Sequence, residues 1–322
     1  MSMKKGILYI VLSAVFFSTM EIAIKMVAGT FHPIQLNLLR FFIGAVILSP
    51  LAFQHMKKYH FHMTKDHFLF FVVTGFLCVV ISMTFYQLAI VYTKASTVAI
   101  LFSCNPLFVI PLAHFLLKER LSKRTLVALG ISLAGILFIV NPFEIQRPFG
   151  IIVALLSAVT FALYSVVGRK GSQQFKCDGV ILTCLSFFTG SMEILALVLL
   201  SKIGFVAGWL RSIGLGVFAN VPVFRGIAWH TLPSLIYIGI FVTGLGFAFY
   251  FLAMDVTSAS TASMVFFIKP ALAPVLALIF LREAITPAVA AGIILIVAGS
   301  LMTLLPAGSK QPELRVSRAK NR

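Results

Sequence analysis

Ten long runs of apolar residues follow one another along the chain, and short gaps rich in Pro, Gly and charged residues separate them. The runs cover roughly residues 6–28, 33–54, 67–90, 95–117, 122–141, 149–168, 178–201, 231–254, 259–281 and 286–306. A helix needs ~20 apolar residues, at ~1.5 Å rise per residue, to cross a ~30 Å hydrocarbon core. The pattern therefore predicts an all-α integral membrane protein with ten transmembrane helices.

The apolar pattern is written twice in the chain. Residues 85–142 align with residues 249–306 at a fixed offset of 164, and 18 of the 58 aligned pairs are identical. A second match, at an offset of 144, relates residues 6–15 to residues 150–159. Repetition on this scale indicates an internal duplication.

Each copy contains five predicted spans, and because five is odd the second copy enters the membrane in the opposite direction. Inverted repeats of this kind are common in secondary transporters. The chain thus divides into a first five-helix repeat, a second five-helix repeat with an insertion, and a basic tail, at residues 1–142, 149–306 (insertion about 202–230) and 307–322. The insertion contains two tryptophans, and we expect an interfacial helix or loop there.

Composition places this protein in lipid. The chain of 322 residues is 60% hydrophobic and 11% charged, with a net charge of +17. With the N-terminus inside, 17 of the 26 Lys and Arg residues lie on the inner side, 6 on the outer side and 3 within spans. Cytoplasmic loops carry such an excess, so we expect a plasma-membrane protein with both termini cytoplasmic. The basic residues lie in short loops, which argues against nucleic-acid binding.

The residues that usually carry catalysis or metal binding form no familiar motif. The four cysteines have no paired or metal-like spacing, and we interpret them as small core residues. Four histidines crowd the first inner loop, and they are His55, His60, His62 and His67. A solvated basic loop explains them better than a metal site. Without a nucleophile–base pair or phosphate loop, we expect no enzyme and no cofactor.

Lys269 is the charged residue that the membrane makes most expensive. It lies ~15 Å into the ninth span, and its repeat partner Asn105 lies ~15 Å into the fourth, so both reach the midplane. Each precedes a proline, which leaves the carbonyl four residues earlier, that of Phe102 or Phe266, without its helical partner. These features predict a polar midplane cavity between the repeats. The other interpretation is that Lys269 pairs with a buried carboxylate for purely structural reasons.

A second charged group shares a depth in the outer third of the membrane. Glu21, Arg40 and Glu193 lie on the first, second and seventh predicted spans, and equal depth allows one ion network. Lys25 follows Glu21 by four residues, a favourable order for a helical ion pair. We favour a structural network, and a proton-coupling role for Glu21 or Glu193 is the alternative.

Two further features have a structural and a functional interpretation. Tyr86 and its partner Tyr250 are predicted near opposite mouths, where they act as gates or belong to the ordinary aromatic belts of a membrane protein, and the belt is the better explanation. Small residues recur in the fifth and tenth spans, which suits close helix packing or a dimer face. The chain is therefore expected to be a monomer or a homodimer.

Four motifs carry a resemblance to a known family, and they are Leu117-Lys118-Glu119, Leu281-Arg282-Glu283, Leu39-Arg40-Phe41 and the series Gly150, Leu156-Ser157-Ala158 and Ala162-Leu163-Tyr164. In this order, and with the duplication, they resemble the EamA-type members of the drug/metabolite transporter superfamily over Gly6–Pro306. The resemblance implies a central cavity lined by spans one to four and six to nine, and export of amino acids, metabolites or drugs. The chain departs from the family pattern at Phe17-Ser18, where Trp-Gly is often seen, and adds Glu21.

We predict a secondary transporter, an exporter of small metabolites such as amino acids or carboxylates, that works by alternating access through the midplane cavity. The predicted substrate-binding residues are Lys269, Asn105, Phe102, Phe266, Tyr164, Glu21 and Arg40. Because Glu21 or Glu193 would neutralise Lys269, a zwitterion fits as well as an anion. The alternative is a non-transporting membrane protein, either a lipid-modifying enzyme or a structural subunit, and it would need catalytic residues near the insertion.

Overall fold

The computed structural model describes residues 2–119, 123–140 and 148–304, and within these ranges the chain forms helices and no β-strand. The repeat boundaries expected at Pro142 and Pro306, and the tail at residues 307–322, lie outside the described residues. The prediction of an all-α protein is confirmed for the part that the structure describes.

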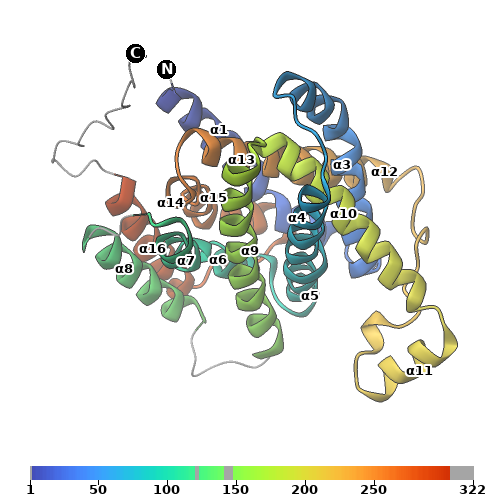
Figure 1. Cartoon of the computed structure of the whole chain (residues 1–322). Coiled ribbons are helices and arrows are strands. Elements are labelled where there is room, and N and C mark those ends of the chain that lie inside the picture. The colour runs from blue at the N-terminus through green and yellow to red at the C-terminus, as the bar shows by residue number, and fades with distance from the viewer. Residues whose placement is uncertain (1, 120–122, 141–147, 305–322) are drawn as a thin grey trace, which may run out of the picture.

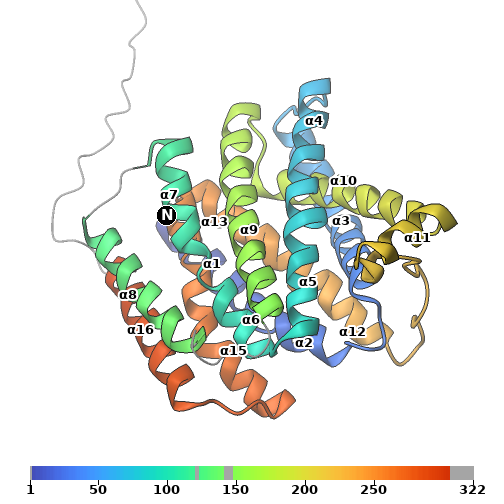
Figure 2. The same cartoon turned by 90° about the horizontal axis from the view of Figure 1, so that it is seen from below.

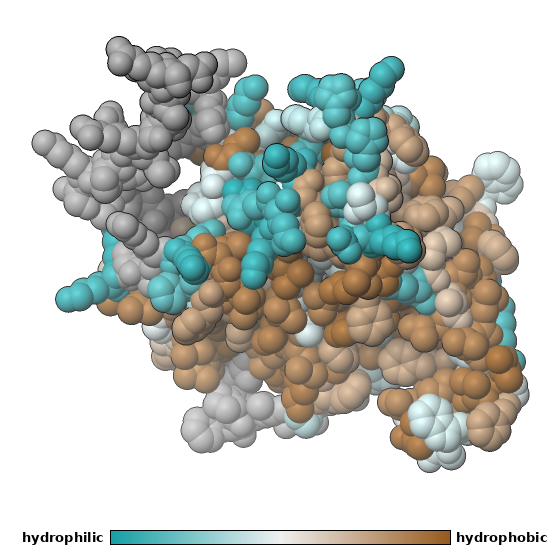
Figure 3. All heavy atoms as spheres, in the orientation of Figure 1, coloured by the Kyte–Doolittle hydropathy of each residue, from teal (hydrophilic) through white to brown (hydrophobic). Residues whose placement is uncertain are grey.

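Seven helical segments are long and apolar enough to cross a membrane, and they are Lys4–Met26, Pro33–Lys58, Lys65–Tyr92, Ala95–Leu117, Pro148–Phe175, Gly179–Leu200 and Leu232–Val256. Three shorter apolar helices, Leu126–Phe138, Leu272–Leu281 and Pro287–Gly299, lie at the fifth, ninth and tenth predicted positions. Apolar side chains cover most of the face shown in Figure 3, and hydrophilic side chains gather at the end where α1 begins. We call this the N-terminal end and the opposite one the far end.

The two spans with a mid-span proline are each divided into two helices, α6 (Ala95–Phe102) and α7 (Asn105–Leu117) in one, α14 (Ala259–Ala262) and α15 (Val265–Leu281) in the other. Pro106 lies in the first turn of α7, where the missing N–H has no helical partner to lose. Pro270 instead lies inside α15, downstream of the break. The proline therefore marks the break in the first case and not in the second.

Two other spans contain π-helical segments. The third consists of α4 (Lys65–Gly75), the π-helix η1 (Phe76–Ser82) and α5 (Met83–Tyr92), and the eighth of α12 (Leu232–Ile236), the π-helix η3 (Tyr237–Leu245) and α13 (Gly246–Val256). The π-helix is rare in proteins and is often found at functional sites. Both π-helices directly precede the helices that carry Tyr86 and Tyr250.

The peripheral helices α8 (Lys123–Val140) and α16 (Pro287–Leu304) pack along each other, on one side of the molecule in Figure 1 and Figure 2. A Cβ added at Gly135 would lie 2.7 Å from the carbonyl oxygen of Gly292, and one at Gly299 equally close to that of Ala128. Small residues let the two helices approach this closely. The structure thus uses the small-residue faces within one chain, which supports their interpretation as scaffold.

The remaining helices form a bundle around the buried core of the molecule. They are α1 (Ser2–Ser18), α2 (Met20–Met26), α3 (Pro33–Lys58), α9 (Pro148–Phe175) and α10 (Gly179–Leu200) together with the divided spans. In this bundle α1 packs against α13 and α15, α3 against α10, and α9 against α5 and α7. Segments far apart in the sequence therefore meet around one apolar core.

The insertion carries a short helix, α11 (Gly204–Ser212), and a turn of 3₁₀-helix, η2 (Gly216–Phe218). It lies on the side of the molecule opposite α8 and α16 (Figure 2). Phe205 and Trp229 are 84% and 89% exposed, which suits contact with the lipid interface. This agrees with the helix or loop that we expect there.

The burial of the cysteines predicts their reactivity. Cys78, Cys104, Cys177 and Cys184 are all free and buried. Cys177 lies between α9 and α10, where burial raises the pKa of its thiol to about 12, so little reactive thiolate forms at neutral pH. We expect N-ethylmaleimide to label the native protein only slightly and to label all four thiols after denaturation in SDS, as mass spectrometry will show. Rapid labelling of the native protein would contradict this packing.

Candidate functional site

A buried ion pair joins the first and ninth spans. Nζ of Lys269 in α15 donates a hydrogen bond to Oε1 of Glu21 in α2, and the hydroxyl of Tyr86 donates to the same oxygen. All three side chains are 0% exposed. The ammonium also lies 5.0 Å from the ring centre of Phe102 and 5.6 Å from that of Tyr86. A buried charge needs such partners, because its desolvation costs several kcal/mol.

A break in the first span presents Glu21 to the lysine. The helix ends at Ser18 and restarts at Met20, which puts Glu21 in the first turn of α2. The hydroxyl of Thr19 donates to the carbonyl of Phe16 at 2.9 Å and shares a hydrogen bond of 2.8 Å with the hydroxyl of Tyr237. These contacts fix the turn and aim the carboxylate into the core.

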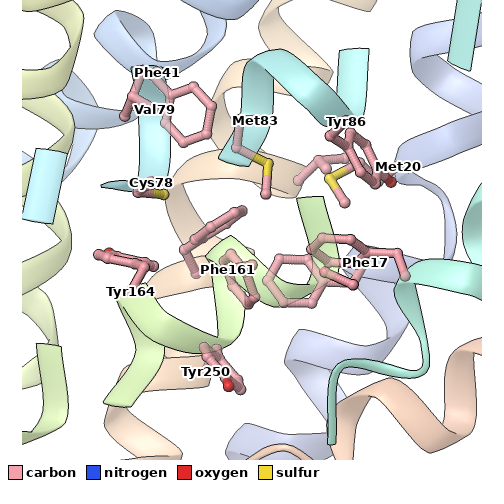
Figure 4. Packing of buried hydrophobic residues seen from close by; sticks show 14 of the residues in the cluster. Phe17, Met20, Phe41, Cys78, Val79, Met83, Tyr86, Phe161, Tyr164 and Tyr250 are labelled. Carbon is pink, nitrogen blue, oxygen red and sulfur yellow. The ribbon is translucent and has the colours of Figure 1, made fainter. Parts of the chain in front are cut away.

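Four phenylalanine rings fill the space next to the ion pair, and we call Phe17, Phe102, Phe161 and Phe266 the central aromatic cluster. Ring centres lie 5.7 Å apart for Phe17 and Phe266, 5.2 Å for Phe102 and Phe161, and 5.5 Å for Phe102 and Phe266. In Figure 4, Phe17 and Phe161 lie in the middle of the core, between Tyr86 and Tyr250. The rings pack at ordinary aromatic distances and close the centre of the bundle.

The contacts in the core follow the two offsets of the sequence. Tyr86 donates to Glu21, and their counterparts at offsets of 164 and 144, Tyr250 and Ser165, are joined by a hydrogen bond of 3.3 Å. The cluster obeys the same relation, since Phe17 maps to Phe161 and Phe102 maps to Phe266. The chemistry of the two equivalent positions differs: Glu21 of the first copy meets Lys269 of the second, whereas their counterparts, Ser165 of the second copy and Asn105 of the first, are neutral.

Asn105 and Tyr164 are fully buried, but among the described residues no hydrogen bond or ring contact joins them to the ion pair. Nδ2 of Asn105 donates to the carbonyl of Ala158 at 2.9 Å, while its Oδ1 has no hydrogen-bond partner among the described residues. Tyr164 packs against Phe161 and Phe251. The predicted midplane cavity is closed in this conformation, because Asn105 and Lys269 are both inaccessible.

The predicted network of Glu21, Arg40 and Glu193 is not formed as direct ion pairs. Arg40 donates to Oδ1 of Asn37 at 3.1 and 3.3 Å, and its guanidinium lies 4.4 Å from the ring centre of Phe41. Both carboxylate oxygens of Glu193 are buried and without a hydrogen-bond partner in the described part of the chain. The depth argument failed because Lys269, on another helix, takes the carboxylate of Glu21.

Two other expectations need correction. Lys25 does not pair with Glu21: its Nζ donates to the carbonyls of Ile90 and Thr93, at 2.6 and 3.0 Å, where α5 ends. Tyr86 and Tyr250 are 0% exposed, which excludes an interface belt as their explanation. Their interpretation as gates is not tested by these contacts and stays a proposal.

Sequence reasoning noted Glu119 and Glu283 but gave them no role. Glu283, beyond the end of α15, accepts hydrogen bonds from the N–H groups of Ala95 and Ser96 at 2.9 and 3.0 Å, and so caps α6. Glu119, beyond the end of α7, accepts from the first two N–H groups of α14 at 3.1 and 3.3 Å. Carboxylates satisfy these amides and favour the positive end of the helix. The two caps lie at opposite ends of the bundle, and their match at offset 164 was the signal available.

A second contact joins helices at each end. Lys25 binds the end of α5 at the far end, and Arg169, its counterpart at an offset of 144, pairs with Asp255 at 3.2 Å near the end of α13. Asp255 also accepts from the N–H of Gly179, the first residue of α10, at 2.5 Å. At each end of the bundle, one glutamate cap and one basic residue therefore hold neighbouring helices together.

A model of the EamA-like transporter family matches residues 4–141 and again residues 148–305. The chain belongs to the EamA-like transporter family. The two matches together cover nearly the whole chain, and the division falls between the fifth and sixth predicted spans. Family membership supports a transporter and leaves the alternatives of a lipid-modifying enzyme or a structural subunit without support.

Several relatives also carry the name of transporter. An uncharacterized transporter of Clostridium kluyveri is 38% identical over 309 residues, which cover 93% of each chain. The uncharacterized transporter YoaV of Bacillus subtilis is 24% identical, over 87% of this chain and 90% of its own. An S-adenosylmethionine uptake transporter of Rickettsia felis is 26% identical, but over only 51% of this chain and 55% of its own.

The fold also occurs among solved structures. One of them, described only as the crystal structure of a protein, superposes with a TM-score of 0.68 and covers 93% of this chain and 96% of its own. Its sequence is 18% identical, so the likeness concerns the fold alone. This EamA-family member is thus a multi-pass membrane protein of a known architecture.

The ion pair makes a prediction about stability. Lys269→Met leaves the carboxylate of Glu21 buried without a counter-charge, which costs ~3–5 kcal/mol, whereas the double variant Glu21→Gln/Lys269→Met removes both charges and regains most of this loss. Thermal unfolding in detergent measures both effects. Lys202→Met is the control, because Lys202 lies at the surface of the far end. Losses that simply add in the double variant would mean that the two residues are not coupled.

Proposed function

We propose that this protein is a secondary transporter of ten transmembrane helices, arranged as two inverted five-helix repeats, that exports small metabolites by alternating access through a midplane site. The reciprocal capping by Glu119 and Glu283 carries the proposal. Each glutamate follows the end of one divided span and caps the start of the other, so these spans run antiparallel and each holds the opposite end of its partner.

A pseudo-twofold axis between the two copies requires reciprocal contacts. If residue i of the first copy contacts residue j of the second, then the counterpart of j in the first copy contacts the counterpart of i in the second. Two sets of contacts obey it: the two glutamate caps, and the ring pairs Phe17–Phe266 and Phe161–Phe102 of the central aromatic cluster. The two tyrosine hydrogen bonds lie within one copy each and support only the likeness of the copies. The double match to the family model supports the same division. The seven long helices and three shorter apolar ones together supply the ten spans that we propose.

Alternating access requires that the two ends open in turn. In this conformation the two glutamate caps are both formed, and the central aromatic cluster lies between them. Opening the far end would release Glu283 from α6, whereas opening the N-terminal end would release Glu119 from α14. The two closures use different residues, so one can open while the other holds.

We propose that the N-terminal end faces the cytoplasm of a plasma-membrane protein. The excess of Lys and Arg in the loops at this end supports the orientation, since cytoplasmic loops carry such an excess. The small-residue faces of α8 and α16 are used within the chain, which is consistent with a monomer and leaves a homodimer to other surfaces.

The charges of the site suit a zwitterionic substrate. When the pair separates, Lys269 is free to bind a carboxylate and Glu21 an ammonium group, and both are then compensated in a low dielectric. Phe102, Phe266 and Tyr164 would contact the apolar part of the substrate. We propose an amino acid or a related amino-carboxylate, with Asn105 and Arg40 as supporting polar residues and Glu193 as a candidate proton-coupling group.

The direction of transport is proposed to be export. The Rickettsia relative is named for uptake, so the experiment has to follow both directions. Proteoliposomes with the protein in known orientation are loaded with a labelled pool of amino acids and small carboxylates, and both efflux and uptake are followed with and without a pH gradient. A gradient dependence that disappears in Glu193→Gln would assign proton coupling to that carboxylate.

The ion pair provides the test of the substrate site. We expect Glu21→Gln/Lys269→Met to remain folded and to lose at least ~100-fold in amino-acid flux. The two charged groups of the substrate would each lose at least one charge-assisted hydrogen bond to the protein. Flux is measured in the same proteoliposomes, with Lys202→Met as the matched control. A folded double variant that still transports at the wild-type rate would refute the site and leave the pair a structural role only.

The two caps provide the test of alternating access. A single cysteine replaces Ser165 in a chain without the four native cysteines, and an impermeant methanethiosulfonate reagent is added from one side at a time. We expect Glu283→Gln to increase labelling from the far end several-fold and Glu119→Gln to increase it from the N-terminal end, because each loses a charged cap. Asp66→Asn, at the exposed start of α4, is the control. Increases on the same side in both variants would contradict the mechanism.

A further inference from the structure

A cavity with both polar and apolar lining lies at the far end of the bundle, and neither Glu21 nor Lys269 lines it. It has a volume of about 500 Å³, within the ~300–1,000 Å³ usual for small-molecule sites. The wall is formed by the end of α2, the loop that follows it, the start of α3, the end of α5 and part of the insertion. Three of the lining residues are basic by type, Lys25, His32 and Arg225, and the lining residues include no Asp or Glu.

Gln87 supplies a hydrogen-bond donor that lacks an acceptor. Its side chain lines this cavity and is 1% exposed, and its Nε2 has no hydrogen-bond partner among the described residues. Buried amide groups are normally satisfied by protein, water or ligand. An acceptor bound in the cavity would satisfy the N–H of Gln87. If the acceptor is an anionic oxygen, Lys25 and Arg225 in the same lining would also attract it.

Lys25 is held in place at the edge of the cavity. Two of its three N–H bonds point to the carbonyls of Ile90 and Thr93, at 2.6 and 3.0 Å, so one donor remains for a ligand. Lys25 forms no direct ion pair in the described part of the chain, and both oxygens of the neighbouring Glu283 accept hydrogen bonds from the start of α6. The ammonium is therefore oriented by backbone groups, with one N–H bond left for a ligand.

The insertion brings the second charge to the cavity. Nε2 of Gln35 in α3 donates to the carbonyls of Val223 and Arg225, at 2.9 and 2.7 Å. At the other side, the N–H of Asn220 donates to the carbonyl of Ser201 at 3.0 Å. Residues 220–225 are thus tied to the bundle at two points, which holds the backbone of Arg225 beside the cavity.

We propose that this far-end cavity binds an anionic group, a carboxylate or a phosphate, through Lys25, Gln87 and Arg225. The site lies outside the midplane ion pair and does not depend on the substrate proposed for it. It gives the insertion a role, which is to carry Arg225 and to wall the cavity. A free anion and the phosphate of an anionic lipid share this chemistry, and the experiment distinguishes them.

Binding is measured on the purified full chain without any transport. Isothermal titration calorimetry with inorganic phosphate and with acetate is carried out on the protein in nanodiscs of phosphatidylcholine. We expect saturable binding with one site per chain for at least one of the two anions. Arg225→Gln and Gln87→Met are each expected to weaken it about tenfold, and Arg211→Gln is the control, since Arg211 lies on α11 of the same insertion and does not line the cavity.

Nanodiscs that contain phosphatidylglycerol separate the two sources. If phosphatidylglycerol weakens apparent phosphate binding to the wild type, and this difference between the two kinds of nanodisc disappears in Arg225→Gln, the lipid phosphate is the occupant. Equal binding in both kinds of nanodisc would identify a free anion. No saturable binding of either anion to the wild type would overturn the site, as would binding that both cavity variants leave unchanged. The variant Glu21→Gln/Lys269→Met should bind phosphate as the wild type does, so a failure of the midplane site is seen separately.

Discussion

The rest of the structure depends on the cost of a lysine at the centre of a membrane protein. Lys269 cannot be hydrated there, so a carboxylate has to reach it from another span. Glu21 does so only because the first span breaks at Thr19 and begins again as α2. The break and the hydroxyl of Tyr86 meet this requirement, and together with the ring of Phe102 they tie the first, third, fourth and ninth spans together.

The two copies meet in the same geometry, but only one of the two equivalent positions is charged. Tyrosine contacts, phenylalanine pairs and glutamate caps recur at the two offsets, whereas Glu21 and Lys269 correspond to Ser165 and Asn105. Packing requires only shape, and shape is kept in both copies. The charged pair thus makes a nearly symmetric core electrostatically asymmetric, so a bound substrate would have one preferred orientation.

The sequence predicted the architecture better than the site. Apolar runs and the repeat reveal the spans, because a helix that crosses lipid must be long enough for the hydrocarbon core and apolar over that length. Depth along a helix, in contrast, ignores rotation about its axis and the reach of a long side chain. Glu21 and Lys269 were assigned different depths and nevertheless meet, while Glu21 and Arg40 were assigned one depth and are not paired. Breaks at Thr19 and before α15 also shift side chains, and neither has a distinctive sequence signal.

The reciprocal caps impose an order on biosynthesis. Glu283 lies 188 residues beyond the first N–H group that it caps, so a ribosome adding ~5–20 residues per second supplies it about 10–40 s after α6 has been made. During that interval the first half stays in the bilayer with the start of α6 uncapped and without its partner span. The insertion machinery or the lipid headgroups have to shelter these amides, and a chain truncated before Glu283 would never complete its first half.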